Sequence, residues 1–496
     1  MAQGLAKTSP YSRKSAVRSG LLTGVGQLLA SGAAAGAAVL LAHRFGRTAA
    51  TDGFLAAYGV YMVLGLAAQA FRLVVVPQLT RAAAEGRLAG ETRAWAAAFL
   101  VLAVPVSVLA VVLRHPLGDA LTSNAISAHE AARALPFLIP AAFVQLLAAL
   151  LASSLAALDE YTVAAVAWGF GNPIGLVVFA ALSGSHGLVS LAWGVLLGGC
   201  ATSSILLTEL LRHRALIGGA RAPRAVGARL FELSRGAAVP LAVQAMYVIS
   251  LRLAGSLGVG AQSSLSYGYV FAATLVAATA SALSLISSAP LTRRGVDAES
   301  AATHVVHAAW LSLVGIAAAT GVFALVGGRL ASGALGSSYS GSVGGQLGRL
   351  VVYLAPWMVV TVAFTVVFPL LFVVEKPSVL LPLAPAALAL HIPISLALRA
   401  WLGLDGLALG LALTTSLVLI ILLVAVSPRM LELASLGLGR VTLGLAALAA
   451  AAFGLTSLVV SGLPAAIVGL AVYVAVLAAV RPRGLREAWA YVRVLH

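Results

Sequence analysis

The chain is dominated by long apolar stretches separated by short polar segments. Most of these stretches hold about 20 or more residues with few charges, which is the length that a helix needs to cross a bilayer. The pattern therefore predicts about fourteen membrane-spanning helices. They cover residues 20–42, 54–79, 94–113, 134–158, 161–183, 187–211, 237–258, 265–289, 303–326, 347–373, 377–398, 404–426, 438–461 and 463–480.

The composition supports this interpretation. Hydrophobic residues make up 61% of the 496 residues and charged residues only 9%, whereas a soluble protein carries about 25% charged residues. The polar segments are too short to fold as a soluble domain. We therefore expect an all-α polytopic membrane protein.

The basic residues predict the topology. Of the 31 Lys and Arg residues, 22 fall in one alternating set of polar segments, seven in the other set, and two within spans. Basic segments stay in the cytoplasm, so both termini are expected there. The net charge of +16 does not indicate nucleic acid, because these residues lie where loops meet anionic membrane lipids.

An internal repeat relates the two halves at an offset near 216 residues. Matching pairs are Phe137-Leu138-Ile139-Pro140 with Tyr353-Leu354-Ala355-Pro356, Gly187 to Gly194 with Gly403 to Gly410, Pro77 with Pro290, and Gln27 with Gln244. Each unit holds six spans, an even number, so we predict parallel repeats that form two lobes around a midplane cavity. The predicted regions are an N-tail (1–19), an N-lobe (20–225), a C-lobe (226–430), two extra helices (431–480) and a C-tail (481–496).

Patterns for catalysis or metal binding do not stand out. Cys200 is the only cysteine, and the nine histidines lack the spacing of metal ligands. A catalytic pair of carboxylates, a Ser–His–Asp arrangement or a phosphate-binding loop does not stand out either. We therefore expect a protein that is not an enzyme and uses no cofactor.

Several short motifs resemble the MviN/MurJ lipid II flippase family of the multidrug/oligosaccharidyl-lipid/polysaccharide exporter superfamily. The resemblance covers roughly residues 18–430. It is carried by Phe45-Gly46, Ala50-Thr51-Asp52-Gly53-Phe54, Pro77, Ala157-Leu158-Asp159-Glu160-Tyr161, Asn172-Pro173, Leu191-Ala192-Trp193-Gly194, Gly198-Gly199 and Glu375-Lys376-Pro377. Fourteen spans also match this family better than the twelve-span drug/cation antiporters.

The resemblance implies a flippase that moves a lipid-linked cell-wall or polysaccharide precursor across a bacterial inner membrane. Family members that move lipid II usually carry cavity arginines at places that here hold Ser31, Ala37, Gly65 and Val270. The substrate is therefore either lipid II or another undecaprenyl-linked glycan. Two other functions stay open, a cation-coupled exporter of small amphipathic molecules and an inactive scaffold for glycan-assembly proteins. We expect a monomer.

Two arginines lie within predicted spans, where an ionisable group is costly. Arg72 and Arg252 either face the cavity and bind a lipid diphosphate, or extend their charge to the membrane surface. Asp52 begins the second span, where it either caps the helix or pairs with Arg47 or Arg44 as an outer gate.

The remaining candidates are uncharged. Gln27 and Gln244 occupy matching helices and either hydrogen-bond neighbouring helices or contact sugar hydroxyls. Pro140, Pro173 and Pro356 are hinge candidates, because proline kinks or breaks a helix. We expect Pro173 to break the fifth span, and the other two to kink the fourth and tenth.

Overall fold

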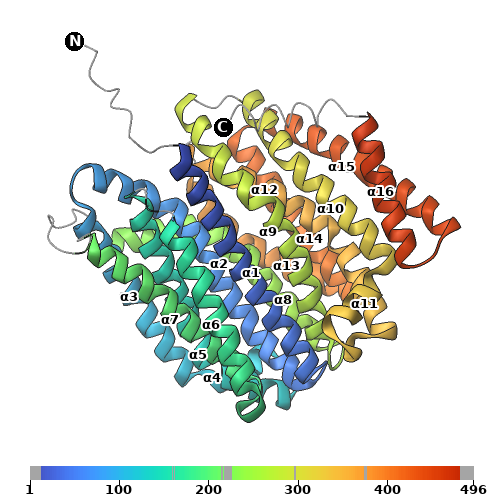
Figure 1. Ribbon diagram of the computed structural model, residues 1–496, viewed down its shortest axis with the longest axis horizontal. Coiled ribbons are helices and arrows are strands. Elements are labelled where there is room, and N and C mark those ends of the chain that lie inside the picture. Colours follow the sequence, from blue (N-terminus) through green and yellow to red (C-terminus); the bar gives the residue numbers. More distant parts are fainter. Residues whose placement is uncertain are drawn as a thin grey trace. The chain divides into compact units, whose positions relative to one another are not determined.

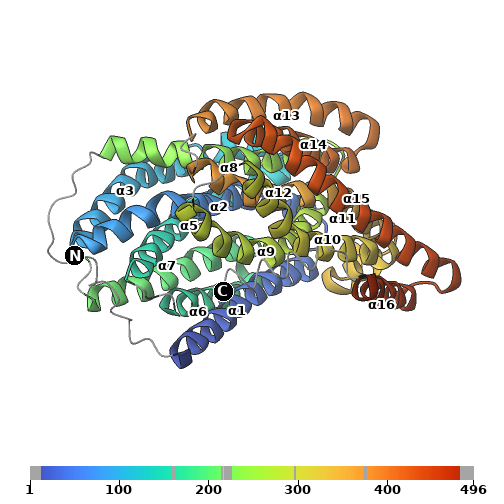
Figure 2. The same ribbon diagram turned by 90° about the horizontal axis from the view of Figure 1, so that it is seen from above.

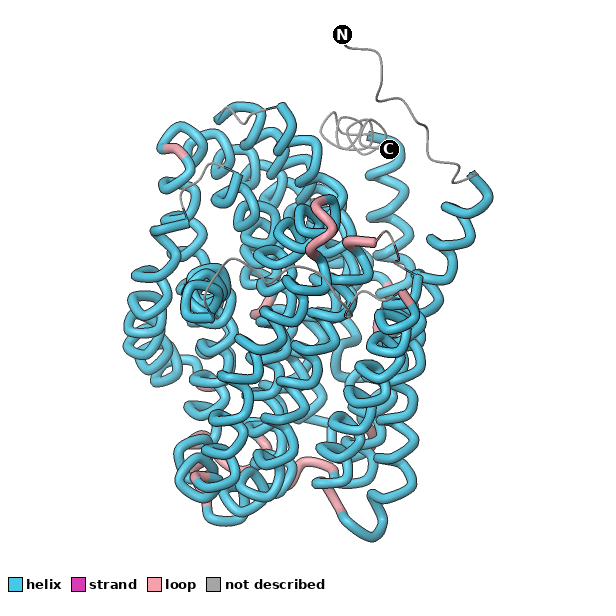
Figure 3. Tube along the Cα trace, turned by 90° about the vertical axis from the view of Figure 1, so that its left-hand side faces the viewer, coloured by secondary structure: helices cyan, strands magenta, loops and turns pink. Residues whose placement is uncertain are grey.

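The computed structural model describes residues 13–158, 160, 162–213, 216, 226–294, 298–373 and 377–480. It does not describe the side chains at 13–24, 27, 66–70, 73–74, 278–294, 298, 300, 372–373 and 377. The described part is almost entirely helical and contains no strand (Figure 3). Most of the two predicted tails lies outside the described residues.

Each predicted span falls on a long helix, except that the tenth is shared by α11 and α12 (Figure 1). The helices are α1 (Arg13–Phe45), α2 (Ala49–Ala84), α3 (Leu88–Val112), α4 (Arg114–Leu121), α5 (Ala125–Ala156), α6 (Thr162–His186), α7 (Val189–Arg212), α8 (Val226–Gly255), α9 (Ala261–Arg294), α10 (Ala298–Leu335), α11 (Gly341–Tyr353), α12 (Ala355–Val373), α13 (Leu380–Leu402), α14 (Leu404–Val426), α15 (Pro428–Val459) and α16 (Leu463–Val480). Short 3₁₀ turns cover Ser337–Tyr339 and Pro377–Val379.

Twelve spans within the described residues are long and apolar enough to cross a membrane. One of them runs through both α11 and α12, from Gly341 to Leu371. The chain is therefore an all-α polytopic membrane protein, as predicted.

The helices form two compact units that differ from the predicted lobes. Unit 1 comprises Met1–Leu40, Leu64–Leu113 and Arg133–Leu233, and unit 2 comprises Leu41–Val63, Arg114–Ala132 and Ser234–His496. Two segments of the predicted N-lobe thus belong to unit 2, and the first turns of α8 belong to unit 1. The predicted lobes and their parallel symmetry stay predictions.

Within unit 1, α6 and α7 pack through glycines. A Cβ atom at Gly175 would lie 2.6 Å from the carbonyl oxygen of Gly194, and one at Gly198 would lie 2.6 Å from that of Gly171. Small residues at these four places let the two helix backbones approach closely, which is a common way to pack helices in a membrane.

Within unit 2, α10 is a central element that packs against α11, α15 and α16 (Figures 1 and 2). A close approach of Gly327 in α10 to Gly348 in α11 leaves a Cβ atom at Gly327 only 2.6 Å from the Cα of Gly348. A second group is formed by α12, α13 and α14, which pack on one another through α14. The two predicted extra helices, α15 and α16, are therefore part of unit 2.

The three hinge candidates differ in their local structure. Helix α6 continues through Pro173, so the predicted break of the fifth span is wrong. Helix α5 likewise continues through Pro140. At Pro356 the helix is interrupted for one residue, Leu354, between α11 and α12. A proline in a first turn is tolerated because its missing N–H would have no helical partner there. Whether any of the three acts as a hinge stays a prediction.

Candidate functional site

The turn between α1 and α2 sets up the start of α2. Gly46 ends α1 with a φ of 60°, a conformation that glycine adopts without steric cost. The hydroxyl of Thr48 then accepts a hydrogen bond of 3.2 Å from the backbone N–H of Thr51. Thr48 is therefore the residue that caps α2.

Asp52 caps a different helix from the one in which it lies. Its side chain accepts hydrogen bonds from the backbone N–H of Gly260 (2.5 Å) and the backbone N–H and hydroxyl of Ser263 (2.7 and 2.5 Å). These N–H groups belong to the residue that precedes α9 and to its first turn, and the N-terminus of a helix carries a partial positive charge. The side chain of Asp52 is only 2% exposed, so this carboxylate is held within the protein by α9.

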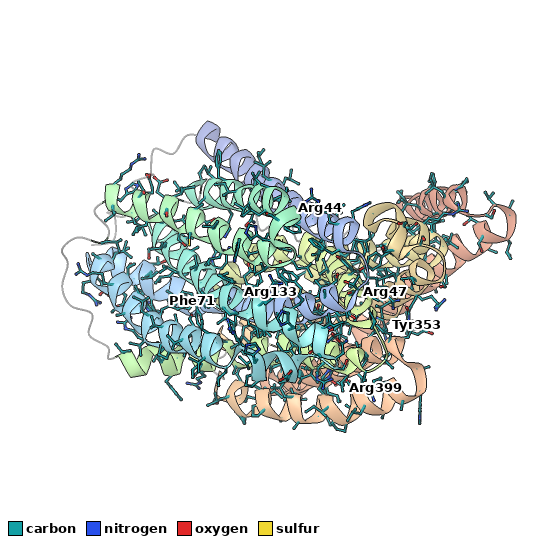
Figure 4. The ribbon with its side chains drawn as sticks, turned by 90° about the horizontal axis from the view of Figure 1, so that it is seen from below. Arg44, Arg47, Phe71, Arg133, Tyr353 and Arg399 are labelled. Carbon is teal, nitrogen blue, oxygen red and sulfur yellow. The ribbon has the colours of Figure 1, made fainter. Side chains whose placement is uncertain are left out.

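Arg47 also binds the turn at the start of α9. Its Nε donates hydrogen bonds to the carbonyl oxygen of Gly260 (2.9 Å) and to the hydroxyl of Ser264 (3.1 Å). We call these residues the carboxylate cluster. Its members are Arg47, Asp52, Gly260, Ser263 and Ser264, all within unit 2. Arg44 lies on α1 with an exposed side chain (Figure 4) and is not a member.

A second set of polar contacts joins the end of α4 to α8 and α9 in unit 2. Arg252 donates from Nε to the carbonyl oxygen of Ala120 at 2.9 Å. Gln262 donates to the carbonyl oxygens of Leu121 (3.2 Å) and Leu251 (3.0 Å). Arg252 lies in the last turn of α8 and helps to hold α4 in place through one N–H group.

Gln244 participates in an interhelical hydrogen bond. Its Oε1 accepts a bond of 2.9 Å from the hydroxyl of Tyr269 in α9. The ring of Tyr269 is stacked on Tyr247 at a centroid distance of 3.9 Å and lies 4.8 Å from Trp357. This geometry favours the structural interpretation of Gln244. The side chain of Gln27 lies outside the described residues.

Arg72 belongs to unit 1 and lies in the second half of α2, where its side chain is half-buried. About 18 Å of helix separates it from the last residue of α2. Among the described residues, the structure shows no hydrogen bond or ion pair to its guanidinium group. Arg72 and Asp52 thus lie on the same helix but belong to different compact units.

Unit 1 contains a buried ion pair that the sequence analysis missed. The two terminal nitrogens of Arg229 in α8 bind the two carboxylate oxygens of Glu91 in α3, one of them at 3.1 Å. The guanidinium also lies 5.2 Å from the centre of the Trp95 ring. Arg229 is 0% exposed and Glu91 6% exposed. We call Glu91, Trp95 and Arg229 the ion-pair cluster, which holds the first turns of α8 in unit 1.

The sequence contains only a weak signal for this cluster, because both charged residues lie in polar segments between the predicted spans. A second missed residue, His391, carried a clearer signal. It is an ionisable residue in the middle of the predicted eleventh span, and such residues are functional candidates by default.

Comparisons with solved structures show a likeness over nearly the whole chain. The structure is similar to that of the lipid II flippase MurJ in an inward closed conformation, with a TM-score of 0.72 and 13% identity, over 94% of this chain and 99% of that chain. No family model matches the sequence, and neither does any curated protein.

Other transporters of the MOP superfamily match over a smaller share of this chain. An inward-facing multidrug resistance MATE family transporter of the MOP superfamily has a TM-score of 0.63 and 16% identity, over 82% of this chain and 95% of that chain. A MOP superfamily transporter from Pyrococcus furiosus, described as having a binding pocket of reverse polarity, has a TM-score of 0.62 and 16% identity, over 84% and 95%. The chain therefore has the fold common to MurJ and these transporters, as its sequence motifs implied.

Proposed function

We propose that this protein is a flippase that moves a lipid-linked cell-wall or polysaccharide precursor across the bacterial inner membrane by alternating access. The likeness to MurJ over 94% of this chain and 99% of that chain is the observation that carries the proposal. The substrate is lipid II or a related undecaprenyl-linked glycan. The protein works as a monomer with both termini in the cytoplasm.

The carboxylate cluster acts as the outer gate in this proposal. It joins the start of α2, from the first predicted repeat, to the start of α9, from the second. Its bonds run from one carboxylate and one guanidinium to backbone groups and hydroxyls, all of which water can bind instead. Such a contact can open and close repeatedly, as alternating access requires.

Arginines supply the cations for a lipid diphosphate, because a guanidinium binds two phosphate oxygens at once. Arg72 is the leading candidate, since no described residue pairs with it. Arg252 already uses Nε to bind Ala120, which makes it a gate-supporting residue as well as a candidate ligand. Arg44 and Arg47 serve at the outer mouth.

The test is a leaflet-accessibility assay in cells depleted of the native protein. A reagent that cannot cross the membrane reports how much lipid-linked precursor has reached the outer leaflet. Re-expression of the wild-type chain should restore access of the reagent, whereas Arg72→Ala and Asp52→Asn should restore little. Asp405→Asn is the matched control, because Asp405 also lies in the first turn of a helix, α14, outside the carboxylate cluster.

Two alternatives give different results in this assay. For a scaffold of glycan-assembly proteins, access of the reagent would be the same with Arg72→Ala and Asp52→Asn as with the wild type. A cation-coupled exporter of small amphipathic molecules, which the likeness to MATE transporters favours, would leave the precursor in the inner leaflet after re-expression. It would instead lower the accumulation of an amphipathic dye.

A further inference from the structure

A buried histidine with three hydroxyl partners lies at the centre of a membrane-spanning helix in unit 2. His391 is eleven residues from either end of α13, or about 16 Å along the helix axis. Ser250 from α8, Thr414 from α14 and Ser395 from α13 surround its ring. All four side chains are 0% exposed.

The hydrogen bonds around the ring are compatible with a proton on either nitrogen. The hydroxyl of Thr414 lies 2.9 Å from the carbonyl oxygen of Gly410 and 3.1 Å from Nδ1 of His391, so its oxygen can accept from Nδ1–H while it donates to Gly410. Nε2 lies 3.0 Å from the hydroxyl of Ser250. The backbone of Met246 in α8 is also hydrogen-bonded to the ring.

This arrangement can satisfy both the neutral and the charged imidazole. A hydroxyl is both a donor and an acceptor, so Ser250 can donate to Nε2 before protonation and accept from Nε2–H afterwards. Ser395 lies 3.3 Å from Nδ1 and 3.2 Å from Nε2, so it can bind either nitrogen. Gly410 makes room for it, because a Cβ there would lie 2.7 Å from the Ser395 hydroxyl oxygen.

The charged groups of the surrounding helices are engaged elsewhere or lie far along the axis. In α8, Arg252 binds Ala120, and in α13, Arg399 binds the carbonyl oxygen of Leu253 and the hydroxyl of Ser256. Asp405 of α14 lies nine residues before Thr414, about 13 Å along the helix. Arg229, Glu232 and Arg235 are in the first half of α8, and α12 contains no ionisable residue. Tyr247 of α8 donates its hydroxyl to Ser266. A fixed counterion for the imidazole is therefore not among these groups.

From this geometry we infer that His391 is a proton-binding site that couples transport to proton movement. The inference rests on the proposed transport function. Water favours a charged imidazole and a dry environment favours a neutral one. The unprotonated ring nitrogen takes a proton from water when the transport cycle hydrates the site. The N–H bond formed in this way breaks, and the proton returns to water, when the opposite face opens.

The first experiment detects the proton directly and needs no lipid substrate. The full chain, labelled with ¹⁵N-histidine, is placed in phosphatidylethanolamine–phosphatidylglycerol vesicles, and its imidazole signals are recorded from about pH 4 to 8, the range around the usual histidine pKa. The signal that disappears in His391→Gln should change from the neutral to the imidazolium position within this range. His186→Gln, which removes a histidine at the end of α6, is the control. A His391 signal that stays neutral throughout, in folded protein, overturns the inference.

A second measurement links the proton to the gate. Hydrogen exchange of the backbone amides of Gly260 to Ser266 should depend on pH, after correction for intrinsic exchange, in the wild type but not in His391→Gln. Equal pH dependence in both proteins contradicts the coupling, as does a response to sodium ions in place of pH. Glutamine retains a donor and an acceptor, so a purely structural role for His391 predicts no difference between the two proteins. If the ¹⁵N signal titrates while the leaflet assay fails, the proposed substrate is wrong and the proton site stands.

Discussion

The carboxylate cluster and the ion-pair cluster both hold the start of a helix with a buried acidic side chain, but they balance its charge differently. Asp52 binds the N-terminus of α9 through backbone N–H groups and a hydroxyl. Glu91 binds a guanidinium that is 0% exposed. Water can replace a contact to the N–H groups at a helix end at low cost. A buried ion that loses its partner is very costly. The first cluster is therefore suited to a gate and the second to a permanent anchor.

Each of the two clusters also joins a segment of the chain to a compact unit that differs from the lobe predicted by the sequence repeat. The carboxylate cluster joins residues 41–63 to unit 2, and the ion-pair cluster joins the first turns of α8 to unit 1. Each cluster thus links one predicted repeat to the other. Helix α8 begins in unit 1 and continues into unit 2, which makes it a shared element of both.

The largest expected effect is the loss of one partner of the ion-pair cluster. Arg229→Met should destabilise the protein by about 3–5 kcal/mol, because Glu91 would stay buried without its counterion. Thermal unfolding of the purified protein in detergent, followed by tryptophan fluorescence, measures the change. The double variant Glu91→Gln/Arg229→Met should recover most of the stability. If the double variant is as unstable as the single one, the start of α8 is held by the packing of Arg229 on Trp95 and not by its charge.

Asp52→Asn is the matching change in the carboxylate cluster and should have a smaller effect on stability. Hydrogen bonds to a charged group contribute about 1.5–3 kcal/mol, and asparagine keeps one acceptor oxygen. We expect the backbone amides of Gly260 and Ser263 to exchange roughly ten times faster or more, with little change in the unfolding temperature. Exchange as slow as in the wild type would show that the charge of Asp52 does not hold α9.

Variants of Arg252 test whether its guanidinium only makes one hydrogen bond to the protein or also binds phosphate through two nitrogens. The structure shows one bond, from Nε to the carbonyl oxygen of Ala120, so Arg252→Ala should cost about 1 kcal/mol. Arg252→Lys should restore the exchange protection of α4, since lysine also supplies a donor. If lysine restores protection but not transport in the leaflet assay, Arg252 also binds phosphate through its fork.

The smallest effect is expected at Arg44, whose side chain is exposed on α1. Arg44→Ala should change the stability by no more than about 0.5 kcal/mol, as is usual for surface positions. In contrast, Arg47→Ala should accelerate exchange at Ser264, because it removes two hydrogen bonds to the α9 turn. Equal effects of the two variants would mean that Arg44 and Arg47 act by net charge alone.

The arrangement of spans could be predicted because each helix in a membrane must satisfy its own backbone hydrogen bonds. An apolar stretch of sufficient length therefore becomes a helix wherever it occurs, and all fourteen predicted stretches lie on helices. The split between α11 and α12 at Leu354 and the uninterrupted α6 at Pro173 were less predictable. Proline is accommodated within α6 at Pro173, whereas Pro356 lies in the first turn of α12.

The partners of the candidate residues were decided by the tertiary structure. From the sequence by itself, Asp52 was a candidate to cap α2 or to pair with Arg47 or Arg44. Only the packing brings the N-terminus of α9 to that carboxylate and leaves Thr48 to cap α2. Glu91 and Arg229 are separated by 138 residues, and no local pattern relates them. The sequence determines which segments are helices, because that depends on local hydrophobicity. Which charges are buried together depends on contacts between distant helices.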